Sequence, residues 1–207
     1  MFYKLILLFR NFKILINSVF IRVLYSSKNI IISGNIICEH LPKITVDKNA
    51  TLKIGSNVTI RKGVEIRVHE NSSVIIMDNC RIDNNVRILS TNSSNVILET
   101  GVRIGLNSVL NGGDSITIGE YSLISGFVYL QTSMHSFKKA GEIQSQGYDH
   151  EAISLGRDNW LGAHVTILPG VKLGEKSIVG SNAVVNSSFL DNSIIAGVPA
   201  KLIKKRI

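Results

Sequence analysis

Aliphatic residues recur at every sixth position along most of this chain. Near the C-terminus one such column consists of Leu155, Leu161, Ile167, Leu173, Val179 and Val185. A second column, two positions earlier in each repeat, consists of Ile153, Asn159, Val165, Val171, Ser177 and Ala183. A period of six matches neither the helical period nor the simple alternation of a strand. It is typical of a parallel β-helix built from hexapeptides, three to a turn.

The first column can be followed back toward the N-terminus as seven triplets. The triplets are Ile32, Cys38, Ile44; Ile54, Ile60, Ile66; Ile76, Ile82, Ile88; Leu98, Ile104, Leu110; Ile118, Ile124, Leu130; Leu155, Leu161, Ile167; and Leu173, Val179, Val185. The spacing is always six within a triplet, but ten, ten, ten, eight, twenty-five and six between triplets. Every insertion therefore falls at the same corner of a three-sided coil. Because chance would not confine irregularities in this way, the pattern predicts an all-β solenoid over residues 30–200.

Each hexapeptide is expected to supply one short strand and one turn. The column residue would point inward, and strands of successive coils would pair in parallel about 4.8 Å apart. Glycine and asparagine recur at the expected turns, as at Gly55, Asn57 and Asn79, because turns need backbone angles that glycine adopts freely and asparagine tolerates better than most residues. Ile195 is expected to begin a final partial coil, and Pro199 to end strand pairing.

The two ends of the chain lie outside the repeat. Residues 1–28 are apolar but interrupted by polar and basic side chains, so no run reaches the roughly 20 residues that cross a bilayer. An amphipathic helical segment over residues 1–29 is expected to cover the first coil, because terminal repeats need capping. The same segment is suited to the membrane interface, so peripheral membrane contact is a second, compatible expectation. Residues 201–207 are expected to form a basic tail.

The net charge of +8 is concentrated at these two ends. Lys4, Arg10, Lys13, Arg22 and Lys28 fall in the first thirty residues, which contain no acidic residue, and four basic residues fall among the last seven. Basic patches interleaved with aromatic residues, as in single-strand-binding proteins, are absent from the sequence. We therefore expect no nucleic-acid partner. We expect an anionic membrane as the partner of the first basic cluster and an anionic cofactor as the partner of the second.

Composition and cysteine placement fit this picture. At 207 residues one domain is expected. Cys38 and Cys80 fall in the repeat columns, so we interpret them as buried, reduced thiols rather than as a disulfide framework. No small-residue cleavage site follows the early apolar run, so the expected compartment is the cytoplasm.

One long insertion, residues 131–152, breaks the repeat and contains His135 and His150. Long loops in a regular scaffold are often functional. A histidine can take the proton of a hydroxyl as that hydroxyl attacks a thioester, without any enzyme nucleophile. We expect His135 to be this base, because it lies five residues after Leu130 and thus close to the rigid coil. His150 is expected in a more mobile return strand.

These motifs resemble those of the left-handed β-helix acyltransferases, the hexapeptide-repeat family. The resemblance rests on the columns, on His135 placed 25 residues before the Trp160-Leu161-Gly162 coil, and on the closing Ala-Gly-Val-Pro-Ala-Lys. Within the family the chain is most similar to sugar O-acetyltransferases of the galactoside, maltose and surface-polysaccharide kind. This resemblance implies left-handed coiling, a homotrimer with active sites between subunits, acetyl-CoA as co-substrate and a saccharide acceptor.

The resemblance also implies site residues. For the donor these are Trp160, Ala163, Ser181, Asn186, Ser187, Lys201 and Lys204. Trp160 precedes a column residue, so it should point outward as a flat apolar wall. Lys201 and Lys204 would meet the CoA phosphates, with a solvated tail as the alternative. Asn107 and Asp114, together with Trp160, would contact the acceptor.

Three other functions are compatible with parts of the sequence. N-acetylation of a nucleotide-linked amino sugar would depend less on a general base. A non-catalytic β-helix scaffold is disfavoured by the loop histidine beside a Trp-x-Gly coil. Zinc-dependent chemistry is disfavoured because His135, His150 and His164 include no close pair of the metal-ligand type, so we expect no metal. The predicted activity is acetyl-CoA-dependent O-acetylation of a saccharide, in the synthesis of capsule, lipopolysaccharide or another surface glycan.

Overall fold

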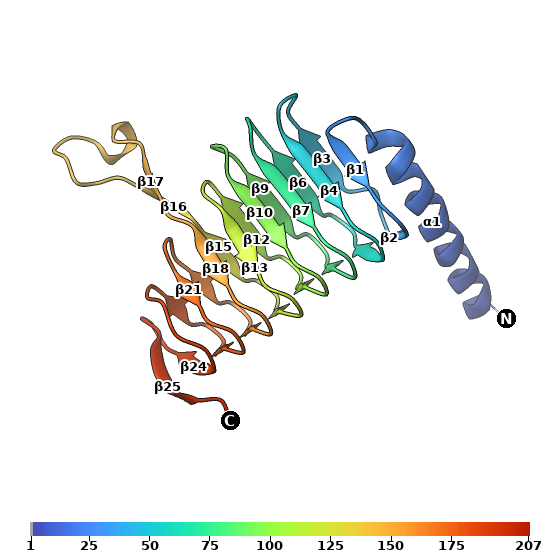
Figure 1. Ribbon diagram of the computed structural model, residues 1–207. Coiled ribbons are helices and arrows are strands. Elements are labelled where there is room, and N and C mark those ends of the chain that lie inside the picture. Colours follow the sequence, from blue (N-terminus) through green and yellow to red (C-terminus); the bar gives the residue numbers. More distant parts are fainter. Residues whose placement is uncertain (1) are drawn as a thin grey trace.

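The computed structural model describes residues 2–207, shown in Figure 1. The side chains at positions 2, 4, 5, 7 and 10 lie outside the described part, and with them the expected basic groups of Lys4 and Arg10. The described chain forms one N-terminal helix, α1 (Phe2–Tyr25), followed by a parallel β-solenoid of about seven coils. Each coil supplies one strand to each of three sheets, which we call faces A, B and C.

The three faces collect the strands in the order predicted from the triplets. Face A contains β1 (Ile30–Ile32), β4 (Thr51–Ile54), β7 (Ser73–Ile76), β10 (Asn95–Leu98), β13 (Ile116–Ile118), β18 (Ile153–Leu155) and β21 (Lys172–Leu173). Face B contains β2 (Ile36–Cys38), β5 (Val58–Ile60), β8 (Arg81–Ile82), β11 (Arg103–Ile104), β14 (Leu123–Ile124), β19 (Trp160–Leu161), β22 (Ile178–Val179), β24 (Ser193–Ala196) and β25 (Lys201–Lys205). Face C contains β3 (Lys43–Val46), β6 (Glu65–Val68), β9 (Arg87–Ser90), β12 (Val109–Gly112), β15 (Tyr129–Gln131), β20 (Thr166–Ile167) and β23 (Val184–Val185).

The strand register confirms the predicted triplets. On face B, for example, Ile82 pairs with Ile104, which pairs with Ile124. The final partial coil is confirmed as well, because Ile195 in β24 continues this row from Val179. An all-β architecture of parallel coils, with one helical segment and one protruding loop, is therefore the fold of this chain.

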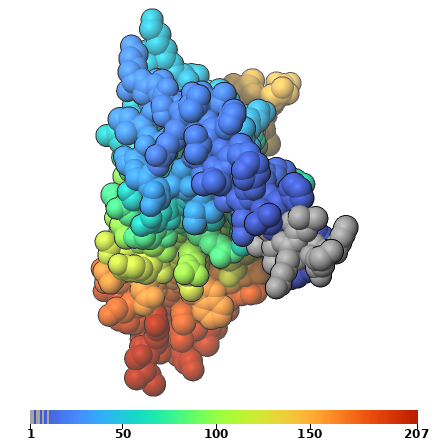
Figure 2. All heavy atoms as spheres, turned by 90° about the vertical axis from the view of Figure 1, so that its right-hand side faces the viewer, coloured from blue at the N-terminus to red at the C-terminus, as the bar shows by residue number. Residues whose placement is uncertain are grey.

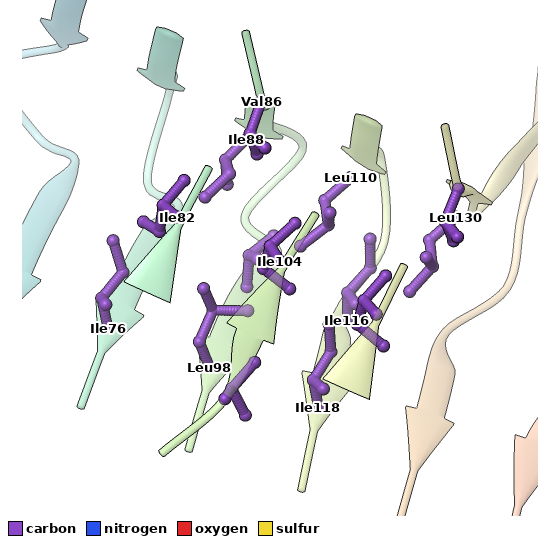
Figure 3. Close-up of a cluster of buried hydrophobic side chains, with 14 of the residues drawn as sticks. Ile76, Ile82, Val86, Ile88, Leu98, Ile104, Leu110, Ile116, Ile118 and Leu130 are labelled. Atoms are coloured by element: carbon purple, nitrogen blue, oxygen red, sulfur yellow. The ribbon is translucent and has the colours of Figure 1, made fainter. Parts of the chain in front are cut away.

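The core is a stack of aliphatic side chains that fills the interior of the prism. Figure 3 shows its middle coils, where Ile82, Ile104 and their neighbours from the other faces point to one axis. Every column residue from Ile54 to Ile195 is buried. Burying one such side chain contributes roughly 1.5–3 kcal/mol. The interior is too narrow for rings, and no aromatic side chain is fully buried among the described residues.

The insertions between triplets lengthen strands rather than create loose loops. The ten-residue spacings, each four residues longer than the repeat, fall at the corner between faces C and A. The strands on both sides of this corner, such as β6 and β7, are four residues long. Buried serines line this corner, where the hydroxyl of Ser90 lies 2.8 Å from that of Ser94 and Ser94 donates to the carbonyl of Gly112. The extended corner thereby keeps its polar groups paired away from water.

Helix α1 covers the open end of the first coil, as the capping interpretation predicts. Ile21 is completely buried. The Ser18 hydroxyl accepts the Cys38 backbone N–H at 3.0 Å, and Asn17 donates to the Glu39 carbonyl at 2.8 Å. Tyr25 donates to the Pro42 carbonyl at 2.9 Å. Figure 2, which looks onto this end, shows the helix in front of the coils.

The C-terminal residues differ from the expected basic tail at 201–207. Residues 201–205 form β25, which turns back and pairs antiparallel with β24. The physical reason is the free edge of β24, whose backbone groups need partners. Lys205 adds side-chain bonds from its ammonium group to the Asp191 carbonyl at 2.7 Å and the Ser193 hydroxyl at 3.2 Å. Within residues 2–207, no helix has both the length and the apolar character of a membrane span.

The buried thiols give a test of this core. Burial, with the nearby charge of Glu39, raises the pKa of Cys38 to about 11, and burial raises the pKa of Cys80 to about 11. Because only the thiolate reacts, we expect both cysteines in the native protein to react with a disulfide reagent at pH 8 at least about a hundredfold more slowly than in the unfolded chain. Thiol titration with and without guanidinium measures this ratio, and native thiols as reactive as unfolded ones would contradict it.

Candidate active site

The long insertion is a β-hairpin that projects from the corner between faces C and A (Figure 1). Its strands are β16 (Ser133–His135) and β17 (Tyr148–His150), and a short 3-10 turn, Ile143–Ser145, lies near its tip. The antiparallel register pairs Ser133 with His150 and His135 with Tyr148. The hairpin thus carries both candidate histidines on one rigid, hydrogen-bonded arm.

The base of the hairpin is anchored to the preceding coil by Thr132. Its buried hydroxyl donates to the Asn111 carbonyl at 2.7 Å and accepts the Asp114 backbone N–H at 3.0 Å. Gly113 allows this close approach, because a Cβ atom there would collide with the Ser133 hydroxyl. The eight-residue spacing between Leu110 and Ile118 therefore contains the residues that hold the base of the hairpin.

His150 is held at the base of the hairpin. Its Nδ1 lies 2.8 Å from the Ser133 hydroxyl and its Nε2 lies 3.5 Å from the Asn92 amide nitrogen. The expectation that His135 lies closer to the rigid coil than His150 is thus wrong. The hairpin register places His150 beside Ser133, at the coil, and His135 one pair further out.

His135 is exposed, and its ring packs against that of Tyr148 with centroids 4.3 Å apart. No group among residues 2–207 hydrogen-bonds to its ring nitrogens. The two histidines therefore differ in what they offer to a ligand. His135 presents an oriented imidazole with free nitrogens, whereas Ser133 and Asn92 approach both nitrogens of His150.

Trp160 lies on face B and points outward, as predicted, with half of its surface exposed. Its indole N–H donates to the Ser125 hydroxyl at 3.2 Å, which fixes the ring against the coil before it. Ala163 and Ser181 occupy successive turns at the corner that follows. Gly162 lets these coils pass closely, because a Cβ atom there would lie 2.6 Å from the Ser181 backbone nitrogen.

Lys201 and Lys204 are exposed on β25, also on face B. The rows of this face run from Trp160 through Ile178 and Ile194 to Lys204, so the last lysine lies three strand spacings, about 14 Å, beyond the tryptophan. The other C-terminal cations are engaged: Lys205 in the bonds described above, and Arg206 with Asp158 at 3.1 Å. Face B thus joins an aromatic wall to two available positive charges.

The remaining predicted residues lie elsewhere. Asn186 and Ser187 follow β23, at the corner between faces C and A, so they do not join the row that contains Trp160. Asn107 sits at the corner between faces B and C, where its side-chain oxygen accepts from Asn85 at 3.1 Å. Asp114 lies beside the base of the hairpin, and its carboxylate accepts the Ser115 backbone N–H at 2.6 Å.

The predicted site residues of one chain therefore fall into two separate groups, which we call half-sites. The first is the hairpin with His135 and Asp114, at the corner between faces C and A. The second is the outer surface of face B with Trp160. Ser125 and Ser133, which hydrogen-bond to Trp160 and His150, are not predicted from the sequence. Ser125 directly follows a column residue and Ser133 lies near the start of the long insertion, so their hydroxyl groups were the available signal. Among the described residues, no cluster of three His, Cys, Asp or Glu side chains could hold a metal.

Comparison with known proteins identifies the repeat. The family described as bacterial transferase hexapeptide (six repeats) matches residues 152–187. The Escherichia coli K12 protein WbbJ, named for O-acetyl transfer in lipopolysaccharide biosynthesis, is 40% identical over 100 residues, which cover 44% of this chain and 51% of WbbJ. Galactoside O-acetyltransferase from the same strain is 34% identical, over 44% of each chain. This chain spans about a third to a half of the length of the curated relatives it matches first.

Solved structures extend the similarity to most of the chain. The polySia-specific acetyltransferase NeuO matches with a TM-score of 0.53 and 25% identity over 87% of this chain and 88% of its own. The polysialic acid O-acetyltransferase OatWY has the same fold, with a TM-score of 0.65 and 22% identity over 86% of this chain and 90% of its own. Repeat, register and these likenesses agree on the fold, which is a left-handed parallel β-helix whose residues 152–187 match the bacterial transferase hexapeptide model.

Proposed function

We propose that this protein is an acetyl-CoA-dependent O-acetyltransferase that modifies a hydroxyl group of a saccharide during surface-glycan synthesis. The observation that carries the proposal is His135, an exposed imidazole with free ring nitrogens on a rigid hairpin. The relatives named for sugar O-acetylation, WbbJ and galactoside O-acetyltransferase, support the class of reaction and acceptor.

The residues can be assigned steps in this reaction. His135 takes the proton of the sugar hydroxyl as its oxygen attacks the thioester carbonyl. The tetrahedral intermediate then collapses, the carbon–sulfur bond breaks, and the imidazolium returns the proton to the sulfur of CoA. Trp160 provides an apolar wall beside the reacting groups, and Lys201 and Lys204 meet the phosphates of CoA. No enzyme nucleophile is required, in keeping with the burial of both cysteines.

A second subunit would unite the two half-sites. His135 and Trp160 lie on different sides of one prism, so the reaction proposed above needs the hairpin of one chain to reach face B of another. Flat prism faces pack with cyclic symmetry, and three-fold symmetry would repeat the same contact three times. We therefore propose a homotrimer with its active sites between subunits.

We also propose that α1 rests on the cytoplasmic surface of the membrane, where lipid-linked glycans are assembled. Among the side chains of the helix that the structure describes, only those along one stripe around Ile21 are buried or half-buried against the coil. The large apolar side chains left exposed are Tyr3, Ile6, Leu8, Phe9, Phe12, Leu15, Ile16, Val19, Phe20, Val23 and Leu24. Lys13 and Arg22 are exposed among them and suit anionic headgroups.

The substitution His135→Ala tests the proposed base. We expect the rate of acetyl transfer to fall by about a hundredfold or more, while CoA still binds, because general-base catalysis contributes roughly that much. Release of the CoA thiol in the presence of a panel of sugars and oligosaccharides measures the rate. His69→Ala is the matched control, since His69 pairs with Asp47 at 3.3 Å in an early coil.

An unchanged rate in His135→Ala would contradict the assignment. If His150→Ala alone then abolished transfer, His150 would be the base. Mild alkali identifies the product: an acetyl ester is cleaved and an acetamide is not. An alkali-stable product would contradict O-acetylation and favour N-acetylation of an amino sugar.

Mixed assembly tests the shared active site. His135→Ala and Trp160→Ala should each be inactive alone. After co-expression in equal amounts, random trimers place an intact His135 opposite an intact Trp160 at about one site in four, so we expect recovery of about a quarter of wild-type activity. Measured activity no higher than that of the separate variants would contradict a site built from both half-sites.

Flotation with vesicles tests the membrane contact. Phe12→Asp and Leu15→Asp change side chains that are 60% and 63% exposed, so the fold should tolerate both. We expect each to weaken binding to phosphatidylglycerol vesicles by about tenfold or more, since burial of one large apolar side chain contributes roughly 1.5–3 kcal/mol. Phe137→Asp, equally exposed on the hairpin, is the control. Unchanged vesicle binding, with an altered oligomer mass, would identify the helix face as a subunit contact.

A further inference from the structure

The row of face B that contains Trp160 continues in the other direction, toward the N-terminal coils. There the outward residues in register are Leu123, then Arg103, then Arg81. The lysines proposed for the phosphates of CoA lie on the opposite side of Trp160. Two arginines therefore occupy the part of the same face that the donor leaves free.

These residues line a groove of about 250 Å³. Leu123 and the ring of Trp160 form an apolar wall, and the two arginines form a cationic wall beside it. Gly105 also lines the groove and lets the neighbouring coils approach closely, because a Cβ atom there would lie 2.5 Å from the Ser125 carbonyl carbon. Apolar walls with a few convergent polar groups are typical of ligand sites.

The charges of this groove are not balanced within the chain. Arg81 and Arg103 stand opposite each other on neighbouring strands, an arrangement of like charges that destabilises a sheet. Asp83 is the carboxylate lining the groove, 3.7 Å from Arg81 but only 3.2 Å from Arg61 in the preceding coil. Arg103 has no ion pair within residues 2–207. An external anion would offset this repulsion.

We infer that this groove binds an anionic group of the acceptor saccharide, with Arg103 as its principal partner and Arg81 as the second. The inference rests on the proposed function, because it places the acceptor beside Trp160. A guanidinium presents a planar fork of donors that fits a carboxylate or a phosphate group in two parallel hydrogen bonds. Ser125 accepts from the indole, so its own proton is available to a sugar oxygen. Arg81 and Arg103 are specificity-determining residues here, not catalytic ones.

Trp160 is the only tryptophan of the chain, so its fluorescence reports on this groove without requiring turnover. We would titrate the 207-residue chain with a sialic acid oligosaccharide, a sugar 1-phosphate and a neutral maltooligosaccharide. We expect saturable emission changes with at least one anionic probe, weakened by salt, and little change with the neutral one. Comparing the affinities for the sialic acid oligosaccharide and the sugar 1-phosphate shows whether the groove prefers a carboxylate or a phosphate group.

Arg103→Gln should raise the dissociation constant of the anionic probe by about ten- to a hundredfold, the usual cost of losing a charged hydrogen-bonding partner. Arg103→Lys should restore part of the affinity. Lys53→Gln, which removes one exposed charge from face A, is the control. In transfer assays Arg103→Gln should raise KM for the anionic acceptor and leave kcat nearly unchanged.

The outcomes separate this inference from the proposed function. Equal affinity for anionic and neutral probes, or unchanged affinity in Arg103→Gln, would overturn the inference even if acetyl transfer to neutral sugars is found. Anion binding that depends on Arg103, with no transfer to any acceptor, would overturn the proposed function and leave the anion site standing.

Discussion

The in-register pairing of each coil with the next is the constraint on which this structure depends. Backbone hydrogen bonds repeat along three faces, so a residue at one position in a coil lies directly above its counterpart in the previous coil. Outward side chains consequently form straight rows. The row through Arg103, Trp160 and Lys204 puts the groove proposed to bind an anion, an aromatic side chain and a cationic end in line, although more than a hundred residues separate its ends in sequence.

The periodic part of the molecule could be predicted from sequence because each inward position must be aliphatic and each face repeats. The triplets, the outward direction of Trp160 and the partial coil at Ile195 follow from that single rule. The hairpin could not be predicted in the same way, because residues 131–152 have no period. Its register, which brings His150 rather than His135 to the coil, depends on Gly113 and Thr132, and these contacts come from a different coil. Strand β25 was missed because its basic sequence resembles a solvated tail.

The division of functional groups between two sides of the prism also follows from the fold. A solenoid interior is filled by its own aliphatic columns and has no room for a ligand, so binding residues must lie on the outside. A hairpin inserted at a corner projects away from all three faces and cannot fold back onto face B of its own chain. A β-helix of this kind therefore gains an enclosed reaction space only by association, which is why the proposed site combines the loop histidine of one molecule with the tryptophan of another.

The two ends of face B are closed in different ways, by α1 at β2 and by the returning strand β25 at β24. A stack of identical coils has no intrinsic reason to stop, since each terminal strand offers the same hydrogen bonds that joined the coils before it. At the C-terminal end the edge of β24 is occupied by an antiparallel strand, so another coil cannot continue the parallel stack there, as strands add to a growing fibril. The closures thus set a finite number of coils and direct association toward the sides of the prism.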